Sequence, residues 1–251
     1  MTIRNNVWRA HRDGRTAIGM SVKAPSARIV ELAAAAELDF VRFDLTAGSV
    51  PLEALPGLID VCVERGITPL VRVETSTQIS AVFAAGVYGI TLPNVANASD
   101  AEAFGAVCAN EGSHLGDQLL TSVQIESINV LEHLVSIATI PSIHMLQSGR
   151  NDLAKSLGLK GQPNHRSVLE IEERIANAAS DAGKLLSLHF APGPESVQQA
   201  QAWLHRNIDC LTIGADTQIL GAAIAQRLSL IRQPLAQPAS SGTSRPQSIP
   251  L

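Results

Sequence analysis

Short apolar runs alternate with longer amphipathic stretches along most of the chain. The apolar runs have the continuous hydrophobic character of strands buried on both faces of a parallel sheet. They predict strands at residues 17–22, 39–44, 68–74, 87–92, 119–126, 142–147, 184–190 and 208–213. The stretches between them predict helices at residues 25–37, 52–65, 76–85, 98–110, 128–138, 166–182, 195–205 and 216–231. Each predicted strand is therefore followed by a helix.

Strand and helix alternation at this density implies right-handed crossovers and a parallel α/β sheet. Eight units within about 215 residues favour a closed (β/α)8 TIM barrel, formed as a single domain, over an open doubly wound sheet. No Gly-x-Gly-x-x-Gly segment follows the first predicted strand, so the main signature of dinucleotide binding is missing.

The two ends of the chain differ from this repeating pattern. Residues 1–16 are amphipathic, and we expect an N-terminal leader that closes the bottom of the domain. Residues 17–232 would form the catalytic barrel. Residues 233–251 are rich in Pro, Ser and Gln and poor in large apolar side chains, a composition that predicts a mostly disordered tail.

Composition and charge exclude several classes of protein. A net charge of −4 without a basic cluster argues against a nucleic-acid partner. No apolar run reaches the roughly 18 residues that a membrane helix needs, and no N-terminal signal is apparent, so we expect a cytoplasmic protein. The three cysteines, Cys62, Cys108 and Cys210, are far apart in apolar surroundings, which indicates reduced and buried thiols.

The fifth and sixth predicted strands suggest a metal site. Alternation along a strand puts Gln124 and Glu126 on one face, and Asp152 follows the next strand. In a parallel barrel these two carboxylates would reach the same mouth, where water and substrate could complete the shell of a divalent cation such as Mg²⁺ or Mn²⁺. Each carboxylate could instead cap the helix or turn that begins beside it.

Other polar residues are predicted at the same mouth, because barrel enzymes place their chemistry at the C-terminal ends of the strands. They are Lys23, Asp44, Arg72, Glu74, Asn94, Gln124, Glu126, residues 148–152, His189 and Asp216. Charges inside a barrel are costly unless they are paired or bind a ligand. Arg72 and Asp44 could simply form an ion pair between adjacent strands, and Lys23 could be an ordinary surface residue. His189, or His144 deeper in its strand, could be a structural histidine.

Several sequence blocks resemble a known family. They are LDFVRFDL (38–45), PLVRVE (69–74), AGVYGITLPNV (85–95), VQIES (123–127) and SGRNDLAKSLG (148–158), together with Glu31 in the first barrel helix. In this order they are similar to the successive blocks of the HpcH/HpaI aldolase and citrate lyase family. The resemblance extends from about Gly19 to Gly221, most of the chain.

The resemblance implies a metal-dependent lyase or synthase. Family members are (β/α)8 barrels that make or break a carbon–carbon bond next to a 2-oxo acid or an acyl-CoA group, through an enolate held by Mg²⁺, Mn²⁺ or Co²⁺. Glu126 and Asp152 would be the metal ligands, and Arg72 would stabilise the enolate. Gln124, Gly149 and Asn151 would bind the small carboxylate substrate. Relatives are homo-oligomers in which the last helix, here around residues 220–231, often packs on a neighbour.

The chain departs from the family pattern at two places. Asp44 is retained, but Ala47 stands where the aldolases have a histidine base and Thr46 where a glutamate is usual. His189, or Asp44 acting through a water, could replace that base. Residues 96–118 lack the long loop that shapes the mouth in aldolases. The alternative function is therefore a non-catalytic or repurposed barrel that binds a metal and a small carboxylate, either as a regulatory protein or as a biosynthetic enzyme with another reaction.

Overall fold

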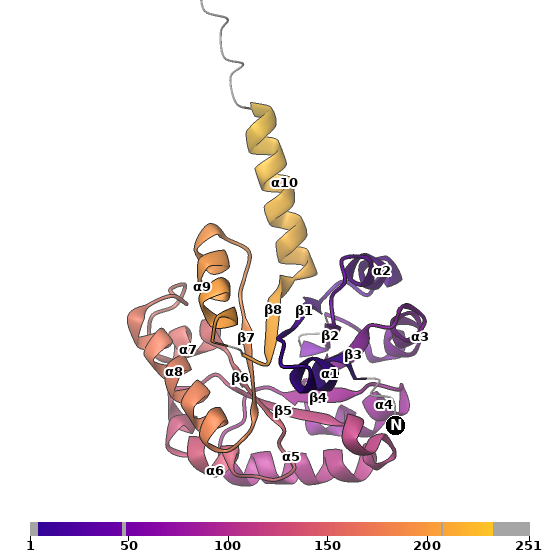
Figure 1. Ribbon diagram of the computed structural model, residues 1–251, viewed down its shortest axis with the longest axis vertical. Coiled ribbons are helices and arrows are strands. Elements are labelled where there is room, and N and C mark those ends of the chain that lie inside the picture. The colour runs from indigo at the N-terminus through magenta and orange to yellow at the C-terminus, as the bar shows by residue number, and fades with distance from the viewer. Residues whose placement is uncertain (1–4, 47–48, 207, 233–251) are drawn as a thin grey trace, which may run out of the picture.

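A computed structural model describes residues 5–46, 49–206 and 208–232 of the protein. Its eight strands pair in parallel, each with the next along the chain, and the eighth closes on the first (Figure 1). They are β1 (Ala17–Val22), β2 (Phe40–Asp44), β3 (Thr68–Arg72), β4 (Gly89–Leu92), β5 (Leu120–Ile125), β6 (Met145–Ser148), β7 (Leu185–His189) and β8 (Cys210–Ala215). The predicted (β/α)8 TIM barrel is confirmed.

Ten α-helices accompany the strands in the described residues. They are α1 (Asn6–Arg12), α2 (Ala27–Ala35), α3 (Leu55–Arg65), α4 (Ile79–Ala84), α5 (Ala98–Glu111), α6 (Leu134–Ala138), α7 (Arg150–Ser156), α8 (Arg166–Asp181), α9 (Pro194–Leu204) and α10 (Asp216–Arg232). Four 3₁₀ segments precede or follow some of them: η2 (Leu52–Ala54), η3 (Ser76–Gln78), η4 (Ser113–Gln118) and η5 (Ile128–Glu132).

Most differences from the predicted elements are shifts of boundary. The helices predicted at 52–65, 76–85 and 128–138 each begin with a 3₁₀ segment. Helix α7 was not predicted, because it has only seven residues and follows β6 after a single glycine. It is held by the burial of Leu153 and Ala154 against the core. A short helix stabilised by tertiary packing leaves little signal in the sequence.

The N-terminal end of the barrel is sealed by apolar side chains. The buried cluster here contains Val7 and Ala10 of α1 together with Ala17, Phe40, Leu70, Leu120, Met145, Leu185 and Cys210 of the strands. Hydrogen bonds hold α1 in place: the Asn6 side-chain amide donates to the carbonyls of Asp39 and Gly66, and Trp8 Nε1 donates to the carbonyl of Leu119 at 3.0 Å. A helix of the segment expected to be a leader therefore covers this end.

Helix α10 is placed differently from the other barrel helices. Figure 1 shows it projecting away from the barrel instead of lying along it. Of its residues only Asp216 is buried, and its apolar side chains Leu220, Ile224 and Ile231 are 58%, 59% and 69% exposed. No helix in the described ranges is long and apolar enough to cross a membrane. Ala47 and the 233–251 tail lie outside the described residues.

Candidate active site

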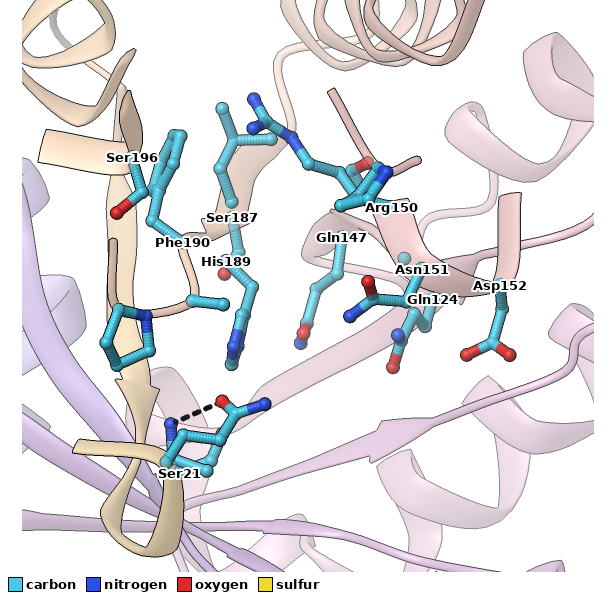
Figure 2. A pocket seen from close by; sticks show the side chains of 18 of the residues that line it. Ser21, Gln124, Gln147, Arg150, Asn151, Asp152, Ser187, His189, Phe190 and Ser196 are labelled. Carbon is cyan, nitrogen blue, oxygen red and sulfur yellow. Dashed lines mark hydrogen bonds between the residues drawn. The ribbon is translucent and has the colours of Figure 1, made fainter. Parts of the chain in front are cut away.

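A pocket of about 580 Å³ opens at the C-terminal ends of the strands. Its wall comes from every strand except β4, and from the first residues of α7 and α9. In Figure 2 the side chains of Gln124, Gln147 and His189 point into the pocket from β5, β6 and β7, and Asp152 lies beyond Gln124. Of the residues predicted at this mouth, those that line the pocket are Lys23, Asp44, Arg72, Gln124, residues 148–152 and His189, whereas Glu74, Asn94, Glu126 and Asp216 do not line it.

Arg72 and Asp44 form a two-pronged ion pair across the β2–β3 register. Arg72 Nε and Nη2 donate to the two Asp44 carboxylate oxygens at 3.1 and 2.6 Å. Lys23 Nζ lies 3.6 Å from Asp44 Oδ2, and the Thr46 amide and hydroxyl donate to Oδ1. The ion pair that the sequence left open is thus present, and Lys23, which could have been an ordinary surface residue, reaches the mouth.

These contacts determine the direction in which the pKa of Asp44 and the pKa of Arg72 shift. Burial acts to raise the pKa of Asp44, but the Arg72 guanidinium and the Thr46 donors outweigh it and lower the pKa overall. Burial likewise acts to lower the pKa of Arg72, and Asp44 reverses this effect. Both carboxylate oxygens of Asp44 are already accepting hydrogen bonds. Asp44 is therefore well placed to orient Arg72, whose Nη1 remains directed at Gln124 Oε1, 3.3 Å away.

Glu126 lies just beyond the end of β5 and is buried. Its Oε1 accepts a hydrogen bond of 2.6 Å from the amide of Asn94, which follows β4. A Cβ added to Gly149 would lie only 2.6 Å from Glu126 Cβ and 3.0 Å from Oε2, so glycine leaves the space that this carboxylate occupies. Burial, together with the charge of Asp152, raises the pKa of Glu126, although the Asn94 amide opposes the shift.

Asp152 is exposed in the first turn of α7, at the same end of the barrel as Glu126. The charges of both carboxylates act on Arg72 and on each other. No group of three or more His, Cys, Asp or Glu side chains that could hold a metal occurs among the described residues. Two carboxylates nevertheless fit a hard cation such as Mg²⁺, which is usually bound by one or two carboxylates with water and substrate oxygens.

The residues predicted to bind substrate lie around these groups. Gln124, Gly149 and Asn151 all line the pocket. The Gly149 amide, however, donates to the carbonyl of Ile125 at 2.9 Å. The Gly149 amide is therefore not available to bind a substrate carboxylate. Gly149 contributes to the pocket only by leaving space.

His189 ends β7 and points into the pocket (Figure 2). Burial, followed by the positive charges of Arg42, Arg72, Lys23 and Arg150, lowers the pKa of its imidazole to about 4. The ring makes no hydrogen bond to another residue in the part of the chain that the structure describes. At neutral pH it is therefore an uncharged acceptor that faces the cavity.

Other candidates have structural partners instead. His144 precedes β6, and its Nδ1 accepts from the Thr121 amide at 3.0 Å. Asp216 accepts from the amides of Lys23 and Ala24, so it fixes the loop after β1. Glu74 lies beyond the end of β3 and is not among the residues that line the pocket. None of the three belongs to the cluster around Arg72.

Sequence reasoning missed two pocket residues, Gln147 and Arg42, and it placed Arg150 at the mouth without giving it a partner. Gln147 donates to the hydroxyls of Thr91 and Ser122, at 2.8 Å each. Arg150 binds both carboxylate oxygens of buried Glu172. Arg42 lies in the middle of β2, two residues before Asp44. The alternation of side chains along β2 could have revealed Arg42, because it must share the inward face of Asp44.

Comparison with known proteins decides the family. The model of the HpcH/HpaI aldolase/citrate lyase family matches residues 17–220. The chain belongs to this family. Its HpcH/HpaI relatives include 2-keto-3-deoxy-L-rhamnonate aldolases of Shigella dysenteriae and Escherichia coli K12. Both are 26% identical to it; the alignments cover 87% and 88% of this chain and 90% and 91% of theirs.

Solved HpcH/HpaI structures share the fold. An aldolase from Desulfitobacterium hafniense superposes with a TM-score of 0.82 at 20% identity, covering 91% of this chain and 97% of its own. The citrate synthase SbnG has a TM-score of 0.79 at 21% identity, covering 90% and 96%. The family is described as aldolase/citrate lyase, and the two sequence relatives are aldolases, which supports assignment of this HpcH/HpaI member to the lyase class of enzymes.

Proposed function

We propose that the protein is a metal-dependent carbon–carbon lyase, or a synthase in the reverse direction, acting on a 2-oxo acid. The observation that carries the proposal is the placement of Arg72 at the end of β3, Glu126 just after β5 and Asp152 in the first turn of α7, all at the C-terminal end of the barrel. Glu126 and Asp152 would hold Mg²⁺, Mn²⁺ or Co²⁺. Such a cation, when bound, would polarise the 2-oxo group and stabilise negative charge on its oxygen.

The chain's own residues supply the rest of the site. Arg72, oriented by Asp44, presents a guanidinium to the developing oxyanion, and a preorganised charge of this kind costs no rearrangement during the reaction. Gln124 and Asn151 would hold the substrate. Asp44 is occupied on both oxygens, which leaves His189 as the better candidate to accept a proton. An anionic substrate among the surrounding cations would raise the pKa of His189 from about 4 toward the working range of a base.

Metal titration tests the proposal. Oxaloacetate decarboxylation and aldol cleavage should require Mg²⁺, Mn²⁺ or Co²⁺, and the isosteric changes Glu126→Gln and Asp152→Asn should each lower the rate by about 10³-fold. Glu132→Gln, at a carboxylate that is 78% exposed on the outer surface, is the matched control and should leave the rate unchanged. Activity without a metal, or full activity in both variants, would refute the proposal.

One observation favours a binding protein as the second candidate. Asp44 already accepts hydrogen bonds on both oxygens, and His189, with a pKa lowered to about 4, is only a weak base at neutral pH. Solvent exchange at the methyl group of pyruvate separates the two functions. An enzyme should exchange these protons when metal is present, whereas a binder should show pyruvate affinity without exchange.

We also propose that the protein forms a homo-oligomer through α10. The helix projects from the barrel (Figure 1). Its apolar side chains Leu220, Ile224, Leu228 and Ile231 are exposed. A second copy would remove this surface from water. Light scattering should give a multiple of the chain mass, and Ile224→Glu should reduce it toward the monomer. A monomeric wild-type protein would contradict the assembly.

A further inference from the structure

Arg42 is a buried cation without a carboxylate partner. It lies between Val41 and Phe43 in β2 and is only 5% exposed. Its Nη1 donates to Thr212 Oγ1 at 3.2 Å, and its Cζ lies 5.4 Å from the centre of the Phe40 ring. Its Nε and Nη2 make no hydrogen bond within the described ranges, although the thiol of Cys210, a weak acceptor, lies close to the guanidinium. Three of the five N–H groups of this guanidinium, one on Nε and two on Nη2, are therefore without a hydrogen bond.

The other two arginines that line the pocket are satisfied. Arg72 binds both oxygens of Asp44, and Arg150 binds both oxygens of Glu172. A guanidinium stays charged in proteins. A buried charge without a partner lowers the stability of the folded protein. The free donors of Arg42 therefore suit the binding of an anionic ligand.

The surroundings of Arg42 suit an anion. Ser21 is its register partner on β1, and Ser187 and Thr212 add hydroxyl groups from β7 and β8. Arg42 itself lines the pocket, one inward layer below Asp44 and Arg72. The potential metal ligands lie on the opposite side, after β5 and β6. The pocket thus has a reacting end near Arg72 and a second cationic end at Arg42.

The charges of the pocket also leave room for a second anionic group. Suppose that a divalent cation balances Glu126 and Asp152. Among the described residues that line the pocket below its exposed rim, the remaining cations, apart from the paired Arg150, are Lys23, Arg42 and Arg72, and the one remaining carboxylate is Asp44. The excess of positive charge corresponds to a dianion. A 2-oxo acid with a single carboxylate would leave part of it unbalanced.

We propose that Arg42 binds a second carboxylate of the substrate, so that the substrate class is a 2-oxo dicarboxylate. This inference rests on the proposed function, because the first carboxylate and the 2-oxo group are assigned to the site around Arg72. Binding requires the guanidinium to turn its Nε–Nη2 edge into the adjoining cavity. Ser21 and Ser187 would donate further hydrogen bonds to the bound carboxylate.

A pair of ligands of equal length tests the proposal. Calorimetry on the Mn²⁺-loaded protein would compare 2-oxoglutarate with 2-oxopentanoate, which lacks only the distal carboxylate, and with pyruvate. We expect 2-oxoglutarate to bind at least tenfold more tightly than 2-oxopentanoate. Arg42→Met should remove this preference, because it removes the charge-assisted hydrogen bonds to the distal carboxylate. It should change the affinity for pyruvate by less than about threefold, because pyruvate has no distal carboxylate. Arg42→Lys should keep part of the preference.

Controls separate the possible failures. Arg166→Met, at an arginine that is 90% exposed on α8, should leave all three affinities unchanged. In the absence of ligand, Arg42→Met should raise the melting temperature, because it removes an unsatisfied buried charge, whereas loss of a structural contact would lower it. Equal binding of the two ligands of matched length by the wild type would overturn the role of Arg42. Failure of pyruvate to bind would instead overturn the proposed function.

Discussion

The two ends of the barrel have opposite chemistry although the same strands build both. At the N-terminal end the inward side chains are apolar, and α1 covers them. Further along the same strands the inward positions carry charged and amide groups, such as Arg42 and Asp44 above Phe40, and Gln124 above Leu120. Burial of apolar side chains at the closed end stabilises the fold. The unbalanced charges at the open end destabilise it. Changes at the two ends should therefore affect different properties.

The largest effect on stability is expected at the closed end. Phe40→Ala should lower the free energy of unfolding by about 3–5 kcal/mol, because it leaves a cavity beneath a fully buried ring. Urea denaturation measures the change. Leu32→Ala, at a side chain that is 53% exposed on α2, is the control and should change the value by less than about 0.5 kcal/mol. A loss below about 1 kcal/mol for Phe40→Ala would contradict the role of this end.

At the open end, Arg72→Met should lower kcat/KM by about 10²–10³-fold, which is typical for loss of a preorganised oxyanion donor. Stability should change much less, because Lys23 Nζ remains 3.6 Å from Asp44. Steady-state kinetics and urea denaturation of the same samples give both numbers. Arg206→Met, at a surface arginine paired with Glu173, serves as control. If Arg72→Met mainly unfolded the protein, the ion pair would be structural.

The pH dependence of stability that arises from His189 tests whether the pocket carries an excess of positive charge. In the unfolded chain its pKa is near 6.5, and in the folded protein it is about 4, so only the unfolded state takes up a proton between these values. Stability from this group is complete above pH 6.5 and falls as the pH drops toward 4, by about 3 kcal/mol, because each unit of pKa difference corresponds to about 1.4 kcal/mol. His189→Gln should flatten this part of the curve, and denaturation at several pH values measures it.

NMR titration of the imidazole gives an independent measurement. Burial is the first cause of the low pKa of His189, and Arg42 is the second. Arg42→Met should therefore raise the pKa toward its ordinary value, whereas Arg166→Met should not change it. An unchanged pKa in Arg42→Met would show that the two groups do not share the pocket.

The smallest effect is expected from Gly149→Ala. The added Cβ would meet Glu126 Cβ at 2.6 Å and Oε2 at 3.0 Å, and the carboxylate would have to move. We expect Mn²⁺ affinity to fall by about tenfold, as for other changes that displace a metal ligand. Gly57→Ala in α3, where nothing lies within 4 Å of the added Cβ, is the matched control. Unchanged Mn²⁺ binding would separate Glu126 from the metal.

Much of the barrel could be predicted because its signals are local. Strands buried on both faces are continuous apolar runs, and the helices between them have a helical period, so the order of elements follows from hydropathy alone. Helix α7 was missed because seven residues carry too little periodicity. The resemblance implied a last helix that packs on a neighbour, but the hydropathy of α10 alone did not specify its outward direction.

By itself the sequence determined the eight-fold alternation, the family and the presence of Asp44, Arg72, Glu126 and Asp152 at strand ends. Only the tertiary structure decided which charges meet. Asp44 binds Arg72 through the register of β2 and β3, and Arg42 reaches Thr212, 170 residues away, because β8 closes on β1. The alternation along a strand assigns a side chain to the inside, but its partner depends on barrel closure, which no local pattern specifies.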